Sequence, residues 1–418
     1  MPDLLRDPRA PLPVDGTVVV VGASLAGWRA AEALRAEGFA GRLVMVGEER
    51  HPPYDRPPLS KQVLAGTWPP ERATLAPPEK LGELGIDAVL GHRAVSLDVE
   101  GRRVVLDDGS VLAADGIVVA TGAAPRRVPG LDGSAAGVLR TLDEAVELRR
   151  RLVAAGPGCR VVVVGAGFIG SEVASSCAGL GCSVTVVELL ATPLAPVVGT
   201  TVGAALADLH ARHGVTLRTG VGVVGARPAE GEGPVALQLS DGTALEADVV
   251  VAGVGVVPAT AWLEGSGLAI DDGVVCDASL FAADGVVAAG DLARWRLAQH
   301  GADEAVRVEH WQLAAEAGVA AARSLLAGRA GAAPFVPVPY FWSDQYGSRI
   351  QMLGRPSPDD DLEVVDGSLA EDRFVVLYGR RGRLTGVLGV GRPRVLMSFR
   401  PLLAAGGSFD EALALGRG

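Results

Sequence analysis

The chain has 418 residues, of which 49% are hydrophobic, and its formal net charge is −11 at pH 7. This length predicts two or three domains, because domains usually run to roughly 100–200 residues. The acidic balance argues against nucleic acid as a partner, since phosphate binding needs a basic face. No apolar run approaches the ~20 residues that span a bilayer, so we expect no membrane partner.

The first residues and the cysteines indicate a cytoplasmic protein. Residues 1–16 are rich in Pro and Asp and lack the basic-then-apolar layout of a signal peptide, so we expect a short loose leader. In a reducing compartment the default state of the four cysteines is the free thiol. Cys177 and Cys182 have a spacing that some disulfide-active flavoenzymes use, but their expected places, late in a helix and at the start of a strand, favour two packed thiols.

A glycine-rich unit opens the chain. The apolar run 17–22 leads into the turn Gly22-Ala-Ser-Leu-Ala-Gly27, and a helix to Glu37 follows. A second strand, 43–47, ends in Glu48. The order of strand, glycine turn, helix, strand and acid is typical of a dinucleotide-binding unit.

The same unit recurs later in the chain. The run 160–165 leads into Gly165-Ala-Gly-Phe-Ile-Gly170, followed by a helix to about Leu180 and a strand that ends in Glu188. Such a turn brings backbone N–H groups and the positive end of a helix to a pyrophosphate, and the acid accepts hydrogen bonds from a ribose. Two copies in register therefore predict two bound dinucleotides.

The first copy departs from the glycine pattern, because Ser24 replaces its middle glycine. A small side chain still permits a pyrophosphate to approach, but less freely. The alternative is a turn without a ligand. The residues of this turn that we expect to contact the first dinucleotide are Gly22, Ser24, Leu25, Ala26 and Gly27, with Glu48 on the adenosine side.

The similarity between the two halves extends beyond the turns. An Asp-Gly hairpin feeds a buried strand in both, at 108–122 and at 241–255. Because the period exceeds a hundred residues, it indicates domain duplication and not a solenoid.

The place of Asp291 in the chain assigns the two cofactors. Ala288-Ala-Gly-Asp291 lies after the second unit, so the first domain is expected to resume there and to reach the ribityl or pyrophosphate end of FAD. The predicted fold is α/β, with two doubly wound Rossmann-like (glutathione-reductase-like) domains and a C-terminal α+β domain. The predicted domains are 1–124 with 256–330 for FAD, 125–255 for NADH and 331–418 as the C-terminal interface domain.

Glu188 favours NADH over NADPH. A carboxylate at this position bonds the free 2′-hydroxyl and repels a 2′-phosphate. The next three residues, Leu189, Leu190 and Ala191, include no cation that could neutralise a phosphate. The alternative is that Glu188 merely faces solvent.

Several stretches together resemble one family, the FAD-dependent ferredoxin reductases, which include putidaredoxin-reductase-like, rhodocoxin-reductase-like and dioxygenase-reductase-like proteins. These stretches run in family order over nearly the whole chain. They are Gly22-Ala-Ser-Leu-Ala-Gly27, Pro53-Tyr-Asp-Arg-Pro-Pro-Leu-Ser-Lys61, Ala120-Thr-Gly122, Gly165-Ala-Gly-Phe-Ile-Gly-Ser-Glu172, Ala289-Gly-Asp291, Val308-Glu-His-Trp311 and Phe341-Trp-Ser-Asp-Gln345. The proline-rich stretch and the Phe-Trp-Ser-Asp-Gln run are far more specific than the glycine motifs.

The resemblance implies that electrons pass from NADH through FAD to a small iron–sulfur ferredoxin, [2Fe-2S] or similar, which feeds an oxygenase. It places Lys61 beside flavin N5, paired with Glu172, where a cation stabilises the reduced ring. Glu172 would neutralise Lys61 without NADH and hold the nicotinamide amide with it. The plainer alternatives are a solvated lysine at a helix start and a surface glutamate.

The resemblance also implies roles for two tryptophans. Trp311 would line the flavin near the nicotinamide, and Trp342 would lie where the ferredoxin docks; core packing is the alternative for both. The further residues expected at FAD are Arg56, Lys61, Val95, Ala120, Thr121, Gly122, Arg140 and Asp291. Those expected at NADH are Gly165, Gly167, Phe168, Ile169, Gly170, Glu172, Glu188, Gly253 and Gly255.

Some chemistry is not expected. No cysteine stands between Glu48 and Gly91, where a disulfide or peroxide reductase of this fold carries its nucleophile. His210 and His213 lie on one helix face, and we interpret them as a surface pair and not as a metal site. Two alternative functions stay open: an NADH-dependent reductase of a small oxidant such as a quinone or peroxide, and an NADH-binding protein like apoptosis-inducing factor.

The expected ferredoxin is acidic, and so is this chain, so uniform charge would oppose their encounter. We therefore expect a local basic patch where the ferredoxin docks. Arginines are dense late in the chain, and Arg294 and Arg296 follow Asp291. Solvated surface charge is the alternative for each of them.

Overall fold

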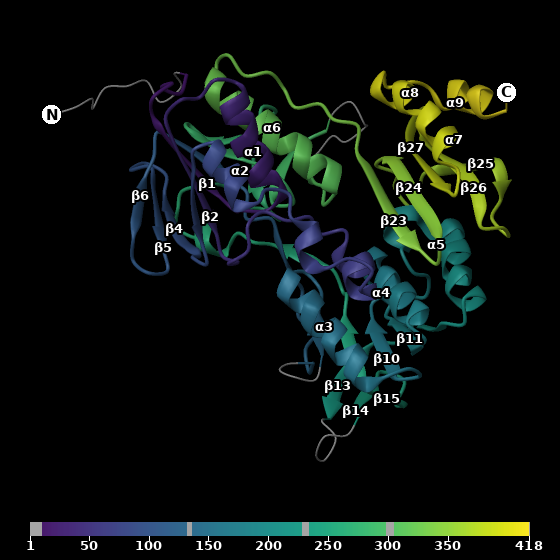
Figure 1. Ribbon diagram of the computed structural model, residues 1–418. Coiled ribbons are helices and arrows are strands. Elements are labelled where there is room, and N and C mark those ends of the chain that lie inside the picture. The colour runs from purple at the N-terminus through teal and green to yellow at the C-terminus, as the bar shows by residue number, and fades with distance from the viewer. Residues whose placement is uncertain (1–10, 132–135, 228–233, 298–304, 418) are drawn as a thin grey trace. The chain divides into compact units, whose positions relative to one another are not determined.

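The computed structural model describes residues 11–131, 136–227, 234–297 and 305–417 (Figure 1). The chain divides into two compact units, each made of three segments. The first unit comprises Met1–Asp55, Thr74–Ala124 and Val257–Pro339. The second comprises Arg56–Ala73, Pro125–Val256 and Tyr340–Gly418.

The first unit is built on a six-stranded sheet in the order β19-β20-β7-β1-β2-β3. All neighbours except the β19–β20 pair are parallel, and β1, β2, β7 and β20 are almost wholly buried. The strands are β1 Thr17–Val21, β2 Arg42–Gly47, β3 Ile86–Leu90, β7 Gly116–Val119, β19 Phe281–Ala283 and β20 Val286–Ala288. Because β20 pairs with β7, the chain returns to its first sheet after the whole second glycine unit.

Two helices of the first unit, α1 (Leu25–Ala36) and α6 (Trp311–Ala327), pack tightly against each other. A Cβ at Gly318 would lie 2.3 Å from the carbonyl oxygen of Ala26, so only glycine allows this approach. The smaller elements of this unit are α2 Pro78–Glu83, β4 Ala94–Asp98, β5 Arg103–Leu106, β6 Val111–Ala113, η4 Ala261–Leu263, β18 Val274–Val275, β21 Ala293–Arg296 and β22 Ala305–Arg307. The short helix η2, Pro70–Ala73, belongs to the second unit.

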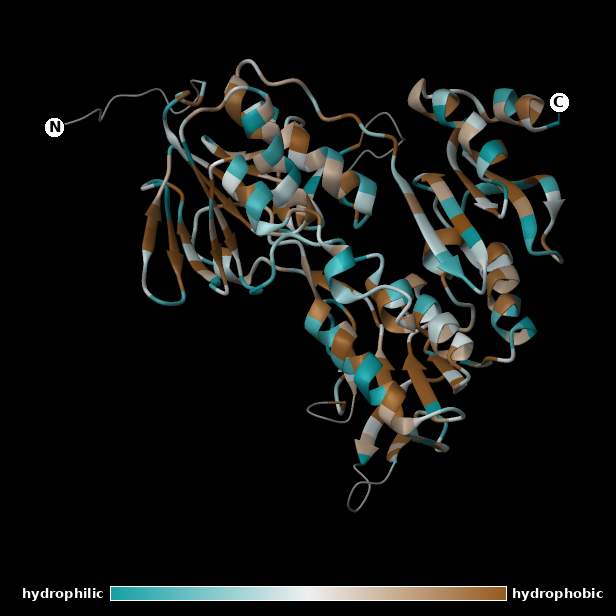
Figure 2. Ribbon diagram, viewed as in Figure 1, coloured by the Kyte–Doolittle hydropathy of each residue, from teal (hydrophilic) through white to brown (hydrophobic). Residues whose placement is uncertain are grey.

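The second unit contains a five-stranded parallel sheet in the order β12-β11-β10-β16-β9. Figure 2 shows β10 and β11 as strongly hydrophobic ribbons. The strands are β9 Gly137–Val138, β10 Arg160–Val164, β11 Ser183–Glu188, β12 Thr216–Thr219 and β16 Val249–Ala252. The accompanying elements are η1 Leu59–Val63, α3 Leu142–Ala155, α4 Phe168–Gly179, α5 Ala195–Arg212, β13 Val223–Arg227, β14 Val235–Leu239 and β15 Ala244–Ala247. The short strands β8 Ala123–Pro125 and β17 Val256–Pro258 lie where the chain passes from one unit to the other.

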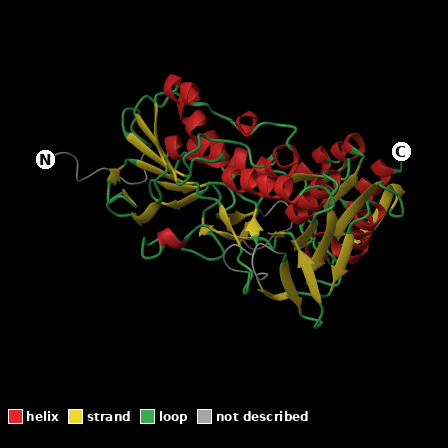
Figure 3. Cartoon of the chain, turned by 60° about the horizontal axis from the view of Figure 1, so that its bottom comes forward, coloured by secondary structure: helices red, strands yellow, loops and turns green. Residues whose placement is uncertain are grey.

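The C-terminal part of the second unit is an antiparallel sheet in the order β23-β24-β27-β26-β25, drawn in yellow in Figure 3. This confirms the predicted α+β character of the region. Its elements are β23 Tyr340–Gln345, β24 Ser348–Gly354, β25 Asp361–Ser368, β26 Arg373–Arg380, β27 Arg383–Val390, α7 Pro393–Ser398, α8 Arg400–Ala404 and α9 Phe409–Gly416. Strand β23 carries the Phe-Trp-Ser-Asp-Gln run.

The predicted surface position of His210 is wrong: its side chain is buried, 2% exposed, between Ser171 and Tyr346.

Of the expected loose leader, residues 1–10 lie outside the described residues, whereas Leu12 is buried in the core of the first unit. Among the described helices, none combines the length and hydropathy of a membrane span.

Candidate functional site

The first glycine turn is shaped by contacts that exclude side chains. Gly22 has φ +120°, and a Cβ there would lie 2.1 Å from the carbonyl oxygen of Ala120. A Cβ at Gly27 would lie 1.8 Å from the carbonyl oxygen of Gly22. Ser24 is in extended conformation just before α1, and its side chain makes no cap hydrogen bond there. The first backbone N–H groups of α1 are therefore free of a side-chain cap at the place where a pyrophosphate would bind.

The other residues predicted for the first dinucleotide in this unit follow strands of the same sheet. Glu48 follows β2, Ala120-Thr-Gly122 follows β7, and Asp291 comes soon after β20. Since β2, β7 and β20 run parallel, their carboxyl ends share one edge, the usual binding edge of such sheets. The Glu48 side chain is 72% exposed, and Val95, on β4, is exposed too. The residues fit a dinucleotide, because this edge combines a glycine turn and an uncapped helix start with an accessible acid.

Trp311 is the first residue of α6, and its side chain is 37% exposed. The indole Nε1–H donates to Asp55 Oδ1 at 2.5 Å. A Cβ at Gly290 would lie 2.9 Å from the Ala26 Cβ and 3.9 Å from the Ala314 Cβ. The starts of α1 and α6 and the Gly290-Asp291 turn therefore meet at one place.

The second glycine turn repeats the first closely. Gly165 has φ +101°, and a Cβ there would lie 2.5 Å from the carbonyl oxygen of Gly253. A Cβ at Gly170 would lie 2.0 Å from the carbonyl oxygen of Gly165. Gly167 precedes α4 without a side-chain cap, so the N-terminus of this helix also fits a pyrophosphate.

The remaining residues predicted at the second turn flank it. Phe168 and Ile169 begin α4; the Ile169 side chain is exposed, and Phe168 packs on Phe341 with 4.4 Å between ring centroids. Gly253 and Gly255 follow β16, and Gly255 has φ +91° in open space.

Glu188, at the end of β11, is held by backbone N–H groups. Its Oε2 accepts from Ala166 N at 2.7 Å and its Oε1 from Leu190 N at 2.8 Å. These bonds fix the carboxylate beside the glycine turn, where an adenosine ribose would lie. The next residue, Leu189, is 70% exposed and brings no positive charge to the acid.

Lys61 lies in η1, a single π-helical turn closed by the hydrogen bond from Val63 N to Pro58 O at 2.9 Å. Such turns are uncommon and occur frequently at functional sites. Lys61 Nζ donates to Glu172 Oε2 at 2.6 Å, and the two side chains are 13% and 4% exposed. The structure therefore brings this pair together and removes it almost entirely from solvent, unlike the solvated lysine and surface glutamate considered as alternatives.

Three residues around this pair were not singled out by the sequence. Ser60 Oγ donates to Glu172 Oε2 at 2.5 Å, and Ser343 Oγ donates to Glu172 Oε1 at 2.8 Å. Gln345 Nε2 donates in turn to Ser343 Oγ at 3.0 Å. Ser343 and Gln345 are alternate residues of the Phe-Trp-Ser-Asp-Gln run, so their spacing could have placed both on one face of a strand.

Arg56 and Arg140, both predicted at FAD, meet in the second unit. Arg56 Nη1 donates to the backbone carbonyl of Arg140 at 2.5 Å. Arg140 N donates to Glu144, whose carboxylate also forms the capping box of α3 with Thr141. The start of α3 thereby fixes the segment that carries Arg140.

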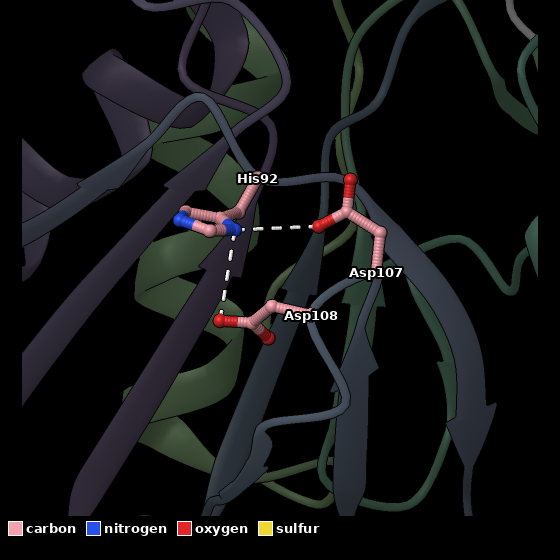
Figure 4. A group of neighbouring side chains, drawn as sticks. All are labelled: His92, Asp107 and Asp108. Atoms are coloured by element: carbon pink, nitrogen blue, oxygen red, sulfur yellow. Dashed lines mark hydrogen bonds and ion pairs between the residues drawn. The ribbon is translucent and has the colours of Figure 1, made fainter.

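One group of described residues could offer ligand atoms to a metal: His92, Asp107 and Asp108 (Figure 4). His92 Nδ1 lies 3.3 Å from Asp107 Oδ1 and 3.7 Å from Asp108 Oδ2, and all three side chains are at least 39% exposed. Asp108 also accepts from Ser110 N, as expected for an Asp-Gly turn. These contacts stabilise an exposed hairpin and need no metal.

The four cysteines are free thiols. Cys159 and Cys182 have their sulfur atoms 3.3 Å apart, at the start of neighbouring strands. Burial, together with the nearby Cys159 sulfur, raises the pKa of the Cys182 thiol to about 12, and burial raises that of Cys177 as well. Thiols with raised pKa values are poor nucleophiles, as packed cysteines are.

The fold and its two glycine turns define a protein that binds two dinucleotides, one on each of two duplicated parallel sheets. The chain belongs to the pyridine nucleotide-disulphide oxidoreductase family, whose model matches residues 16–318. A second family model, described as reductase C-terminal, matches residues 340–416.

Relatives of known name cover nearly the whole chain. Rhodocoxin reductase of Rhodococcus erythropolis is 35% identical over 96% of this chain and 95% of its own length. The ferredoxin reductase component of chlorobenzene dioxygenase from Cupriavidus sp. (strain PS12) is 36% identical over 94% of each chain. The structure is also similar to one described as the covalent putidaredoxin reductase–putidaredoxin complex, with a TM-score of 0.87, 34% identity and coverage of 94% and 93%.

Proposed function

We propose that this protein is an FAD-containing reductase that takes electrons from NADH and gives them to a small iron–sulfur ferredoxin, which in turn feeds an oxygenase. When bound, FAD accepts a hydride from NADH and releases the two electrons singly to an acceptor. The relatives named above are a rhodocoxin reductase and the ferredoxin reductase component of a dioxygenase.

One observation carries this proposal. Helix α4 begins at the second glycine turn and, just after its first turn, places Glu172 in a buried ion pair with Lys61. A dinucleotide-binding helix start and a buried charged pair thus lie on one element. Burying charge is costly, so a buried ion pair beside such a turn marks a candidate functional site.

The chain's residues divide between the two cofactors by their position. The turn Gly22–Gly27, Glu48, the segment Ala120–Gly122 and Asp291 would hold FAD, with Trp311 at the flavin. Val95, Arg56 and Arg140 are the further FAD residues in this proposal.

The second turn would hold NADH. Gly165, Gly167 and Gly170 leave room for the pyrophosphate, and Glu188 would accept from the ribose. Phe168, Ile169, Gly253 and Gly255 would border the same ligand. Lys61 would stabilise negative charge on the flavin, and Glu172 would hold the nicotinamide amide.

The test is a steady-state assay of cytochrome c reduction by NADH with a panel of purified ferredoxins. We expect turnover to depend on a ferredoxin, and the purified protein to be yellow and to release FAD. Rapid NADH oxidation by a quinone or peroxide, with no stimulation by any ferredoxin, would instead favour a reductase of a small oxidant. Slow turnover with every acceptor and a long-lived charge-transfer complex would favour an NADH-binding role.

We also propose that exposed arginines steer the acidic ferredoxin. Arg296, at the end of β21, is exposed, whereas the guanidinium of Arg294 is held by Asp271 and by the backbone of Ala305. Arg296→Glu should therefore raise KM for ferredoxin while ferricyanide reduction stays unchanged, and added salt should have the same selective effect. Arg294→Glu is a poorer variant, because it also breaks local structure.

A cytoplasmic location is part of the proposal. It is supported by the free thiols of Cys159 and Cys182, whose close sulfur atoms would be expected to oxidise more readily in an oxidising compartment.

A further inference from the structure

We propose that Ser343 and Gln345, from the C-terminal strand β23, form a hydrogen-bond relay that presents one particular oxygen of Glu172, Oε1, to the carboxamide of NADH. This inference rests on the proposed function, and it assigns positioning roles to two residues outside the dinucleotide-binding sheets. All residues in the argument belong to the second unit.

The two oxygens of Glu172 have different surroundings. A carboxylate offers about four acceptor positions, two on each oxygen. Oε2 already accepts from Ser60 Oγ at 2.5 Å and from Lys61 Nζ at 2.6 Å. Oε1 accepts from Ser343 Oγ at 2.8 Å and has one acceptor position left. The amide of a nicotinamide is a donor, so it meets Glu172 most easily at Oε1, without displacing Lys61.

Gln345 gives the relay its direction. Its side-chain NH₂ group can only donate, and it donates to Ser343 Oγ at 3.0 Å. The single proton of the Ser343 hydroxyl is then directed to Glu172. Ser343 is fully buried and Gln345 is 2% exposed, so water does not compete for either bond.

The strand that carries the relay is fixed to the same helix at a second point. Tyr346 N, directly after β23, donates to Ser175 Oγ on α4 at 2.7 Å. The β23–β24 turn therefore holds α4 independently of Ser343. Loss of the Ser343 hydroxyl should leave this junction in place and change only the orientation of the Glu172 carboxylate.

The inference is tested with two ligands that share the adenosine half. The protein with FAD bound is titrated with 1,4,5,6-tetrahydro-NAD, an unreactive analogue of NADH that keeps the carboxamide, and with ADP-ribose, which lacks the nicotinamide. In Ser343→Ala, Kd for the tetrahydro analogue should rise roughly 3- to 10-fold, as expected for a bond to a charged group that is lost only in part. Kd for ADP-ribose should change less than about 2-fold.

Two further variants sharpen the result. Ser343→Thr keeps the hydroxyl and should restore binding of the tetrahydro analogue. Ser171→Ala is the matched control, since Ser171 is a buried serine of α4 whose hydroxyl bonds His210 and not the Glu172 carboxylate. It should leave both Kd values unchanged.

Equal weakening of both ligands in Ser343→Ala, the same pattern in Ser171→Ala, or unchanged binding in Ser343→Ala would each overturn the relay. Stopped-flow reduction of the flavin by NADH separates this outcome from failure of the proposed function. If the unaltered protein is not reduced by NADH, the function fails. If it is reduced and Ser343→Ala is indistinguishable from it, only the relay fails. If Ser343→Ala does not fold, Ser343→Cys, with its weak donor, should give an intermediate rise in Kd.

Discussion

The two glycine units of this chain share a backbone and differ in what their helices bury. In both, the first glycine has positive φ and lies against the carbonyl that follows a neighbouring strand, and the last glycine lies against the carbonyl of the first. The buried residues of α1 are all apolar or glycine, whereas α4 also buries Ser171 and Glu172. The duplication thus preserves the backbone of the pyrophosphate turn. The side chains of the following helix decide whether polar groups are buried beside that turn.

The difference matches the two expected cofactors. Helix α1 packs closely on α6 through Gly318, an arrangement suited to a permanently held group. Helix α4 packs on η1 and β23 and makes several polar contacts with them. Buried polar networks of this kind specify one arrangement of side chains, and they suit a site whose ligand comes and goes.

The largest expected effect comes from filling the first glycine of each unit. Gly22→Ala places a Cβ 2.1 Å from a backbone carbonyl at φ +120°, so we expect a loss of about 3 kcal/mol or more of stability and protein purified without FAD. Gly165→Ala should keep its FAD and raise KM for NADH at least about 100-fold. Flavin absorbance and thermal unfolding measure the first effect, and steady-state kinetics the second.

A matched control for both is Gly242→Ala, in the β14–β15 hairpin. Gly242 has φ +83° but open space around its Cβ, so only the backbone strain is added, about 1 kcal/mol. If the control lost FAD too, the comparison between the units would fail.

The acids that end the two units can be separated by nicotinamide preference. NADH should exceed NADPH in kcat/KM by about 100-fold, since a 2′-phosphate would meet the Glu188 carboxylate without a cation beside it. The double variant Glu188→Ala with Leu189→Arg should narrow this preference, because the exposed Leu189 position gives an arginine room. Glu48→Ala, at the matching place in the first unit, should leave the preference unchanged. Equal use of NADH and NADPH by the native enzyme would contradict the role of Glu188.

Acid should act on the second unit through His210 of α5, whose buried ring lies within hydrogen-bond distance of Ser171 on α4. Burial, and to a lesser degree the nearby His213, lowers the pKa of His210 to about 4, from an ordinary value near 6.5. Between these values the unfolded chain binds a proton that the folded chain does not, so stability falls as pH drops from 6.5 towards 4. At pH 5.5 the loss should be about 1 kcal/mol relative to neutral pH.

Urea denaturation of the native protein and His210→Gln at pH 7.5 and 5.5 measures this contribution. The variant should be less stable at pH 7.5 and should lose less stability on acidification. Parallel losses in the two proteins would assign the pH dependence to other groups.

The smallest effect concerns the middle position of each turn. Ser24→Gly should change FAD binding less than about 2-fold, because Ser24 has extended backbone that needs no glycine. Gly167→Ser should weaken NADH a few-fold by crowding the pyrophosphate. Fluorescence titration of FAD into apoprotein and of NADH into holoprotein would detect both. A strong loss with Ser24→Gly would mean that the serine itself binds the ligand.

Much of this molecule follows from local pattern. The duplicated units and their strands were predictable because glycine turns, buried valine runs and terminal acids are set within about thirty residues of each other. The return of the chain to the first sheet was anticipated from the position of Asp291, and β20 lies beside β7 as that required. The Lys61–Glu172 pair was expected only through family resemblance, because 111 residues separate the two partners.

The sequence by itself determined the two nucleotide turns. Each depends on glycines, because a Cβ at these positions would collide with a backbone carbonyl oxygen. Only the tertiary structure decided which polar side chains share a buried environment. Ser343 bonds Glu172 across 171 residues of sequence, and the buried His210 bonds Tyr346 across 136 residues. Such contacts have no local signature, because serine and histidine are common on surfaces, and their burial is set by which elements pack together.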